Sequence, residues 1–261
     1  MAICYDRLFH LMIDKKISNA QLKEKAGFSA NIITRLKRNE YVSIESIEKI
    51  CRAMGCGVDD ILEFVPEDLK PEFFEGFDYF HIEGYLVQNQ ALIRKAVEYA
   101  HDAGCLISID MASYNVVESN LAFLHDIVER YVDIVFANET ESKAFTKLDN
   151  PEEALDEIAK LCKIAVVKIG KDGSWIKSGD EKHFIETYPA QTKDATGAGD
   201  TYAAGFLYAH SLGMPLETCG KAGSIIAAKV VEVVGTKIDI PRWKVAKQEI
   251  RDLFAANGKQ I

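Results

Sequence analysis

The sequence predicts a small all-α domain followed by an α/β domain with a doubly wound, mainly parallel sheet. Apolar residues recur at helical spacing as far as residue 62. From about residue 77, short β-type runs alternate with amphipathic segments, which is the pattern of a parallel sheet with crossover helices. The 261 residues are 48% hydrophobic and 27% charged, so the chain can form one large or two ordinary globular domains.

The first 66 residues are expected to form short helices. Ser18, Ser29 and Ser43 stand where N-caps belong, and Gly27 separates the second helix from the third. Pro66 is expected to end the last helix, which would include 58–62. The apolar positions are Leu8, Leu11, Met12, Leu22, Ala26, Ile32, Ile33, Leu36, Ile44, Ile47, Ile50, Val58, Ile61 and Leu62.

The remaining chain is expected to form the α/β domain. Its strands are predicted at 78–82, 105–110, 132–137 and 164–170, and its helices at 89–103, near 118–130 and from Pro151. The runs GSWIKSG and KHFIETY predict a hairpin, and the residues beyond them are predicted to be helical. We place the boundary at 64–72, with domains at 1–66 and 69–261.

The charge is distributed unevenly between these two parts. The chain has a net charge of −9, yet residues 1–66 hold 10 Lys and Arg against 9 Asp and Glu. Within 15–38 there are seven basic residues and one acidic residue. A compact basic segment in an acidic protein predicts a local contact with a polyanion.

Several classes of protein are excluded by the composition. The most apolar stretch, SIIAAKVVEVVG, is interrupted by Lys229 and Glu232, so no membrane partner is expected. The N-terminus carries Asp6 early and has no small-residue cleavage site, so it is not read as a signal peptide. The six cysteines show no zinc-ligand spacing, which predicts free thiols in a cytoplasmic protein.

The basic segment lies in a motif that resembles the Cro/CI-type helix-turn-helix of the XRE family. The resemblance covers nearly all of residues 3–66 and rests on Gln21 opening helix two, Ala26-Gly27 in the turn, Ser29 capping helix three, and the following SIESIEKICRAMGC helix. It implies double-stranded DNA as a partner, with helix three (about 30–38) in the major groove. The candidate DNA-binding residues are Gln21, Ser29, Asn31, Thr34, Arg35, Lys37 and Arg38.

Two kinds of contact are expected from these residues. Asn31 suits adenine and Arg35 suits guanine, whereas Gln21, Lys37 and Arg38 suit phosphates. Such modules usually bind as dimers, so a homo-oligomer is expected. The alternative is that these charged side chains form only a solvent-exposed helix face with no DNA-binding role.

The stretch KDATGAGDTYAAGF places three small residues before a helix. A helix N-terminus presents unpaired N–H groups, and glycines let a phosphate approach them closely. Gly197, Ala198 and Gly199 are therefore candidates for a phosphate site. Asp200 would repel a phosphate, but it suits a base that accepts the proton of an attacking hydroxyl. The alternative is a glycine-rich helix start that packs tightly against a strand.

Residues 69–261 resemble the PfkB family of ribokinase-like and adenosine-kinase-like enzymes. The stretches that carry the resemblance are FHIEGYLVQ, SIDMASYNVV, DIVFANETESKAF, VVKIGKDGS, DATGAGD and GTKIDIPRW. It implies a ribokinase-like fold that uses ATP with Mg²⁺ to phosphorylate a sugar or nucleoside hydroxyl, with no metal site built from protein ligands alone. It makes Asp200 the catalytic base and Gly197–Gly199 the anion hole.

The same resemblance assigns further residues. Asn138 and Glu141 match an N-x-x-E motif that helps to place Mg²⁺ and phosphate, although the same spacing is a capping box. Further residues near the nucleotide or its phosphates are implied to be Lys168, Gly170, Gly173, Asp110 and Asn115.

The sequence departs from this family at its N-terminal side. The family's strand-rich N-terminal half, with its acceptor-binding acid and its lid, is not recognisable, and the helix-turn-helix stands in its place. Two functions therefore remain open: a PfkB-type phosphotransferase with a DNA-binding module, or a DNA-binding regulator whose kinase-like part only binds nucleotide or mediates assembly.

Overall fold

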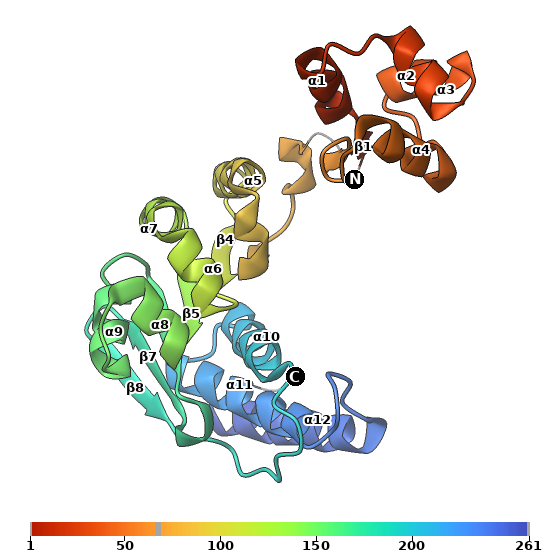
Figure 1. Ribbon diagram of the computed structural model, residues 1–261. Coiled ribbons are helices and arrows are strands. Elements are labelled where there is room, and N and C mark those ends of the chain that lie inside the picture. The colour runs from red at the N-terminus through yellow and green to blue at the C-terminus, as the bar shows by residue number, and fades with distance from the viewer. Residues whose placement is uncertain (1, 66–68, 260–261) are drawn as a thin grey trace. The chain divides into compact units, whose positions relative to one another are not determined.

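A computed structural model of the chain describes residues 2–65 and 69–259 and divides the protein into two compact units (Figure 1). Unit 1 is Met1–Leu69 and unit 2 is Lys70–Ile261. Unit 1 is largely helical and unit 2 is α/β with a mainly parallel sheet, which confirms the predicted fold class. None of the helices in the described ranges is long and apolar enough to cross a bilayer.

Unit 1 contains α1 (Asp6–Asp14), α2 (Asn19–Ala26), α3 (Ala30–Lys37) and α4 (Ile44–Met54). Ser18 and Gln21 form a capping box at α2, and the Ser43 hydroxyl accepts from the Ser46 N–H at α4. Ser29 occupies the predicted N-cap position of α3, which confirms the predicted helix start, although its side chain makes no capping hydrogen bond. The fully buried core residues are Tyr5, Leu8, Leu22, Leu36, Ile50 and Ile61.

Unit 1 also contains a small sheet that the helical pattern does not predict. Strand β1 (Ala2–Cys4) pairs antiparallel with β2 (Glu63–Val65). The predicted last helix is wrong: residues 58–62 make a single turn, in which the N–H groups of Ile61 and Leu62 donate to the Val58 carbonyl. The chain then extends into β2. Pro66 lies outside the described residues.

Unit 2 is built on a six-stranded sheet in the order β3-β4-β5-β6-β7-β8. The pairs from β3 to β6 are parallel, and the two remaining pairs are antiparallel, so the predicted hairpin is confirmed. Within the described chain, β3 pairs with β4 alone and forms an edge of the sheet. The strands are β3 (Tyr79–Glu83), β4 (Leu106–Asp110), β5 (Ile134–Asn138), β6 (Ile164–Lys168), β7 (Ser174–Ser178) and β8 (Glu181–Ile185).

Two groups of helices pack on unit 2's sheet (Figure 1). Alternate strand residues such as Phe136 and Val166 face α10 (Ala198–Ser211), α11 (Leu216–Val231) and α12 (Ile240–Ala256) in one core cluster. The intervening strand residues face the crossover helices. Two of these helices, Tyr114–Ser119 and Leu121–Arg130, stand where one helix was predicted near 118–130. The crossover helices are α5 (Gln90–Asp102), α6 (Tyr114–Ser119), α7 (Leu121–Arg130), α8 (Glu139–Thr146) and α9 (Pro151–Ile158).

Helices α10 and α11 approach each other unusually closely, and glycines make this possible. A Cβ on Gly205 would lie 2.7 Å from the Ala222 carbonyl oxygen, and one on Gly223 would lie 2.8 Å from the Tyr202 oxygen. Both obstructing atoms belong to the backbone, so neither can move aside without displacing a helix. The closeness of this contact fixes α10, and therefore its first turn, against the rest of unit 2.

We expect Gly205→Ala to destabilise unit 2 by about 1–3 kcal/mol, the usual cost of overpacking a core. Gly57→Ala in unit 1 is the matched control, because its new methyl would meet only the Asp60 carboxylate at an ordinary 3.6 Å. Calorimetry of both variants checks this. Equal melting temperatures of unit 2 in the two variants would contradict the close helix contact.

Candidate functional site

The carboxyl ends of four parallel strands meet at one edge of unit 2's sheet. The last residues of β3, β4, β5 and β6 are Glu83, Asp110, Asn138 and Lys168. Glu83 is paired in register with Asp110, and Asn138 with Lys168. In open α/β sheets, ligands bind outside the carboxyl ends of the strands, so this edge is the first place to look for a site.

Asp110 and Lys168 form a nearly buried ion pair at this edge. Their Oδ2 and Nζ atoms are 2.6 Å apart, and their side chains are only 7% and 13% exposed. The residue after next, Ala112, has a left-handed backbone with φ of 63°, and its N–H points to the Asp110 carboxylate. The pair links the ends of two strands that lie on either side of β5.

The turn that precedes α10 is held by a network around Asp194. One carboxylate oxygen accepts from the N–H and the hydroxyl of Thr196, at 2.9 and 2.7 Å. The other accepts from the Gly235 N–H at 2.9 Å. These bonds, with that from Gly235 the strongest influence, lower the pKa of Asp194 to about 2. These hydrogen bonds tie the turn before α10 to the Gly235 backbone.

The glycines of this turn leave the start of α10 open. Gly197 is the N-cap residue, with a left-handed φ of 79°, and a Cβ there would lie 3.0 Å from the Thr236 methyl group. A Cβ on Gly199 would lie 3.1 Å from Lys168 Nζ. The lysine ammonium therefore lies against the first turn of α10, which also contains the exposed Asp200. The structure thus brings together the N–H groups of a helix start, a cation and an acid.

Asn138 and Glu141 form a complete capping box at the start of α8. The Asn138 side chain accepts from the Glu141 N–H at 2.9 Å, and the Glu141 carboxylate accepts from the Asn138 N–H at 2.8 Å. The Glu141 side chain is buried, and burial raises its pKa, with a smaller raising effect from Asp110. A capping role is therefore established, and Asp110 and Lys168 are close enough to act electrostatically on the same carboxylate.

The other residues near the predicted nucleotide site have different surroundings. Gly170 begins a single 3₁₀ turn (Gly170–Asp172), and a Cβ on Gly173 would lie 2.3 Å from the Ile185 carbonyl oxygen, so Gly173 is required by the packing of the hairpin. Asn115 is exposed on α6, and its side chain makes no hydrogen bond to any described residue. The structure therefore does not join Asn115 to the strand-end residues.

Sequence reasoning missed two residues at this edge, His81 and Glu83. The His81 Nδ1 lies 2.8 Å from the Ser108 hydroxyl, and burial lowers the pKa of the imidazole. Burial, and then the charge of Asp110, raise the pKa of Glu83. The signals in the sequence were the acid that directly follows the predicted strand 78–82 and the stretch FHIEGYLVQ, which carries the family resemblance. Their partners come from β4, which no local pattern could supply.

The predicted DNA-binding residues of unit 1 lie at and before α3. The Arg35, Gln21 and Arg38 side chains are engaged inside the unit, and the Arg38 guanidinium lies 3.9 Å from the Glu40 carboxylate. The Arg35 guanidinium donates to the Tyr41 carbonyl and lies 3.6 Å from the Glu40 carboxylate, while the Gln21 side-chain oxygen accepts from the Ser18 N–H. The exposed members of the set are Gln21, Ser29, Asn31, Thr34, Lys37 and Arg38.

Comparisons with known proteins agree with this geometry. A model of the pfkB family of carbohydrate kinases matches residues 58–243, and a model of the Cro/C1-type HTH DNA-binding domain matches residues 7–67. An uncharacterized sugar kinase of Archaeoglobus fulgidus is 27% identical over 84% of this chain and 87% of its own length. A nucleoside kinase of Methanothermobacter thermautotrophicus is 35% identical over 55% of this chain and 45% of its own.

Solved structures show the same fold. Adenosine kinase from Sinorhizobium meliloti aligns with a TM-score of 0.67 and 31% identity, covering 72% of this chain and 59% of that one. A probable sugar kinase from Rhizobium etli aligns with a TM-score of 0.65 and 32% identity, covering 70% and 57%. The chain thus spans a little over half the length of these kinases. Because the pfkB model covers well over half of the chain, the chain belongs to the pfkB family of carbohydrate kinases, and it carries a Cro/C1-type helix-turn-helix domain ahead of its kinase-like unit.

Proposed function

We propose that unit 2 binds Mg-ATP at the strand ends and transfers its terminal phosphate to a sugar or nucleoside hydroxyl. The observation that carries this proposal is the contact between Lys168 and the glycine turn, beside Asp200 at the start of α10. The helix N-terminus is a source of positive potential for a phosphate, and the Lys168 ammonium, which Asp110 holds in place, is a further donor beside it. Phosphoryl transfer depends mainly on such positioning and charge stabilisation.

In this proposal each residue has a distinct task. The N–H groups from Gly197 to Gly199 hold the transferred phosphate, and Lys168 neutralises part of its charge. Asp200 accepts the proton of the attacking hydroxyl, because it is exposed in the first turn of the same helix. The hairpin glycines Gly170 and Gly173 shape the neighbouring wall for the nucleotide.

Mg²⁺ is proposed to reach the site with the nucleotide. Within the described ranges, no cluster of three His, Cys, Asp or Glu residues is arranged to hold a metal ion. Asn138 and Glu141 lie at the strand ends and suit a role beyond the water shell of the ion, since Mg²⁺ keeps several waters when it accompanies phosphates. The bound ion supplies further neutralisation of phosphate charge.

A second function is supported by the length of the aligned region. The match to the nucleoside kinase covers 45% of that protein, and β3 is an open edge of the sheet. An acceptor pocket could be completed by other residues, for example those of a second copy of the chain. Without such a pocket, unit 2 acts as the nucleotide-binding part of a DNA-binding regulator. Orienting an acceptor contributes on the order of 7–11 kcal/mol to such a reaction, so its loss would abolish most turnover.

Unit 1 is proposed to bind double-stranded DNA through α3. Lys37 and Arg38 are exposed at the end of that helix, and they suit the phosphates, while Asn31 near its start suits a base edge. The six cysteines are free, which fits a protein of the reducing cytoplasm.

We expect Asp200→Asn to lower acceptor-dependent ADP release at least about 100-fold, since a general base contributes at least that much. Mg-ATP affinity should remain within about threefold, because Asp200 makes no attractive contact with phosphate in this proposal. Asp180→Asn, in the exposed turn between β7 and β8, is the control. The assay uses adenosine and ribose as acceptors at several protein concentrations.

The outcomes of this assay separate the two functions. Turnover that is lost only in Asp200→Asn supports the kinase. Mg-ATP binding without turnover at any protein concentration supports the regulator, and turnover only at high concentration indicates a pocket that subunits complete together. If Mg-ATP does not bind, both forms of the proposal are wrong.

We expect Glu141→Gln to weaken Mg-ATP binding about tenfold, as outer-shell changes at metal sites do. Burial raises the pKa of Glu141, so its ionised form costs stability, and this cost grows as the pH rises through the raised pKa. Relative to the wild type, the variant should therefore gain stability as the pH rises above the ordinary carboxyl pKa of 4.5. Glu139→Gln, exposed in the same helical turn, is the control for calorimetry. Equal nucleotide affinity in both variants would leave only the capping role.

We expect Lys37→Ala/Arg38→Ala to weaken binding to a mixed-sequence duplex and to reduce the salt slope by about two, because two phosphate contacts are lost. The control Lys49→Ala/Arg52→Ala removes the same charge from α4, outside the predicted DNA-binding residues. Fluorescence anisotropy at several salt concentrations measures both. An equal loss in the two double variants would show that only net charge matters.

A further inference from the structure

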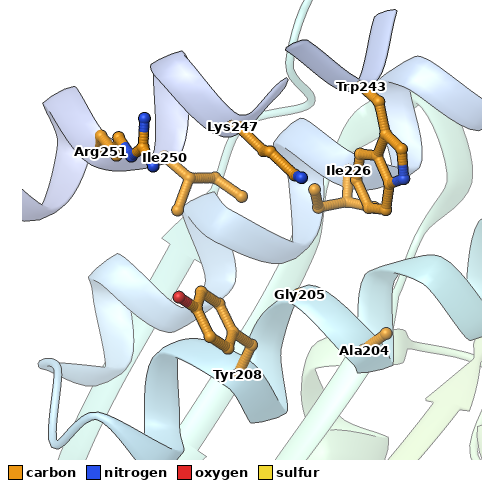
Figure 2. Close-up of a pocket in the computed structure, with 8 residues that line it drawn as sticks. All are labelled: Ala204, Gly205, Tyr208, Ile226, Trp243, Lys247, Ile250 and Arg251. Carbon is orange, nitrogen blue, oxygen red and sulfur yellow. The ribbon is translucent and has the colours of Figure 1, made fainter. Parts of the chain in front are cut away.

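A cavity of about 360 Å³ opens between α10, α11 and α12 (Figure 2). None of the residues assigned to the phosphate site lines it. Its nearest lining residue along α10 is Ala204, one helical turn after Asp200, which is about 6 Å along the axis. The cavity is therefore a separate feature of unit 2. Its lining residues are Ala204, Gly205, Tyr208, Ile226, Trp243, Lys247, Ile250 and Arg251.

The walls of the cavity suit an apolar or aromatic body. Trp243 stands at one end, and Tyr208 lies on the α10 side (Figure 2). These two side chains are 41% and 48% exposed, although large aromatic side chains gain most from burial. Helix α10 carries small and apolar residues on all sides, and such a helix is normally covered on all sides. Ala204 and Tyr208 nevertheless face outward.

The rim of the cavity carries two cations that have no anionic partner among the described residues. Lys247 and Arg251 lie one turn apart on α12, and neither forms an ion pair with any described residue. The Lys247 Nζ lies 6.0 Å from the centre of the Trp243 ring. By contrast, Arg242 on the same helix is paired with Glu232 and Asp239. No carboxylate lines the cavity, although unit 2 has an excess of acidic residues.

We propose that this cavity binds a small organic anion, in which a carboxylate, sulfonate or phosphate is attached to an aromatic or branched aliphatic body. The body fills the space between Tyr208, Ile226 and Trp243. The anionic group lies at the rim, where Lys247 and Arg251 donate charge-assisted hydrogen bonds. A volume of this size is typical of small-molecule sites, and an apolar lining with a few polar groups at one end is their usual composition.

The test uses a pair of dyes that differ in charge: anilinonaphthalene sulfonate and the uncharged N-phenylnaphthylamine. The chain has two tryptophans, and in a Trp175→Phe background Trp243 alone reports on the cavity. Saturating Mg-ATP keeps the dyes from the proposed phosphate site. We expect the sulfonate to bind about tenfold more tightly than the neutral dye, as two charge-assisted hydrogen bonds allow, and to quench Trp243.

Three variants locate the binding. Lys247→Met/Arg251→Met should lower sulfonate affinity about tenfold and leave the neutral dye within about threefold, because methionine keeps the apolar stems. Lys221→Met/Lys244→Met, with the same loss of charge outside the cavity, should change neither affinity. Ala204→Leu should weaken both dyes by occupying the cavity. The three lining residues that carry substitutions, Ala204, Lys247 and Arg251, are all exposed, and thermal melts confirm that each variant folds.

Other results would overturn the proposal. Sulfonate binding that leaves Trp243 fluorescence unchanged, or that survives Ala204→Leu, would place the dye elsewhere. If Lys247→Met/Arg251→Met and Lys221→Met/Lys244→Met lowered sulfonate affinity equally, the preference for the sulfonate over the neutral dye would come from net charge alone. A wild-type dimer that Ala204→Leu dissociates in sedimentation, without dye binding, would show that a second copy covers this face instead.

Discussion

The burial of Asp110 against Lys168 is the constraint on which the strand-end site depends. Two charges are removed from water together, and removing one partner of such a pair costs about 3–5 kcal/mol because the other is left uncompensated. The pair also joins the ends of β4 and β6, so it fixes the position of the lysine ammonium beside the first turn of α10. A substitution of Asp110 would therefore change both the charge at this edge of the sheet and the position of the Lys168 ammonium.

Glycines provide the other half of that arrangement. Gly197 lets the chain turn through a left-handed conformation into α10, and Gly205 lets the helix settle onto α11. One residue sets where the helix begins, and the other sets how close it lies. At the start of α10, Gly197 carries no Cβ, which would lie 3.0 Å from the Thr236 methyl group. In unit 1, by contrast, side-chain hydrogen bonds fix the helix starts, through the capping box of α2 and the Ser43 cap of α4.

Local patterns were sufficient for most of the fold. The strands β4 to β6, the hairpin and the glycine turn follow from short stretches whose period or composition is visible in the sequence. The errors arose where distant residues decide. Strand β1 exists only because residues 63–65 lie beside residues 2–4, and 58–62 is too short a segment to remain helical before that pairing. His81 finds its hydrogen-bond partner, Ser108, on a neighbouring strand. Arg35 contacts Glu40 and Tyr41, which lie in the loop after α3.

The pairing of β1 with β2 also has a consequence for evolution. Because the first and last strands of unit 1 are neighbours, the segment enters and leaves its own fold at one place. A module with adjoining ends can be joined to an unrelated gene, or removed from it, without opening its core. Recombination that transfers the coding sequence for residues 2–65 would therefore transfer a segment whose two ends lie side by side in the folded unit.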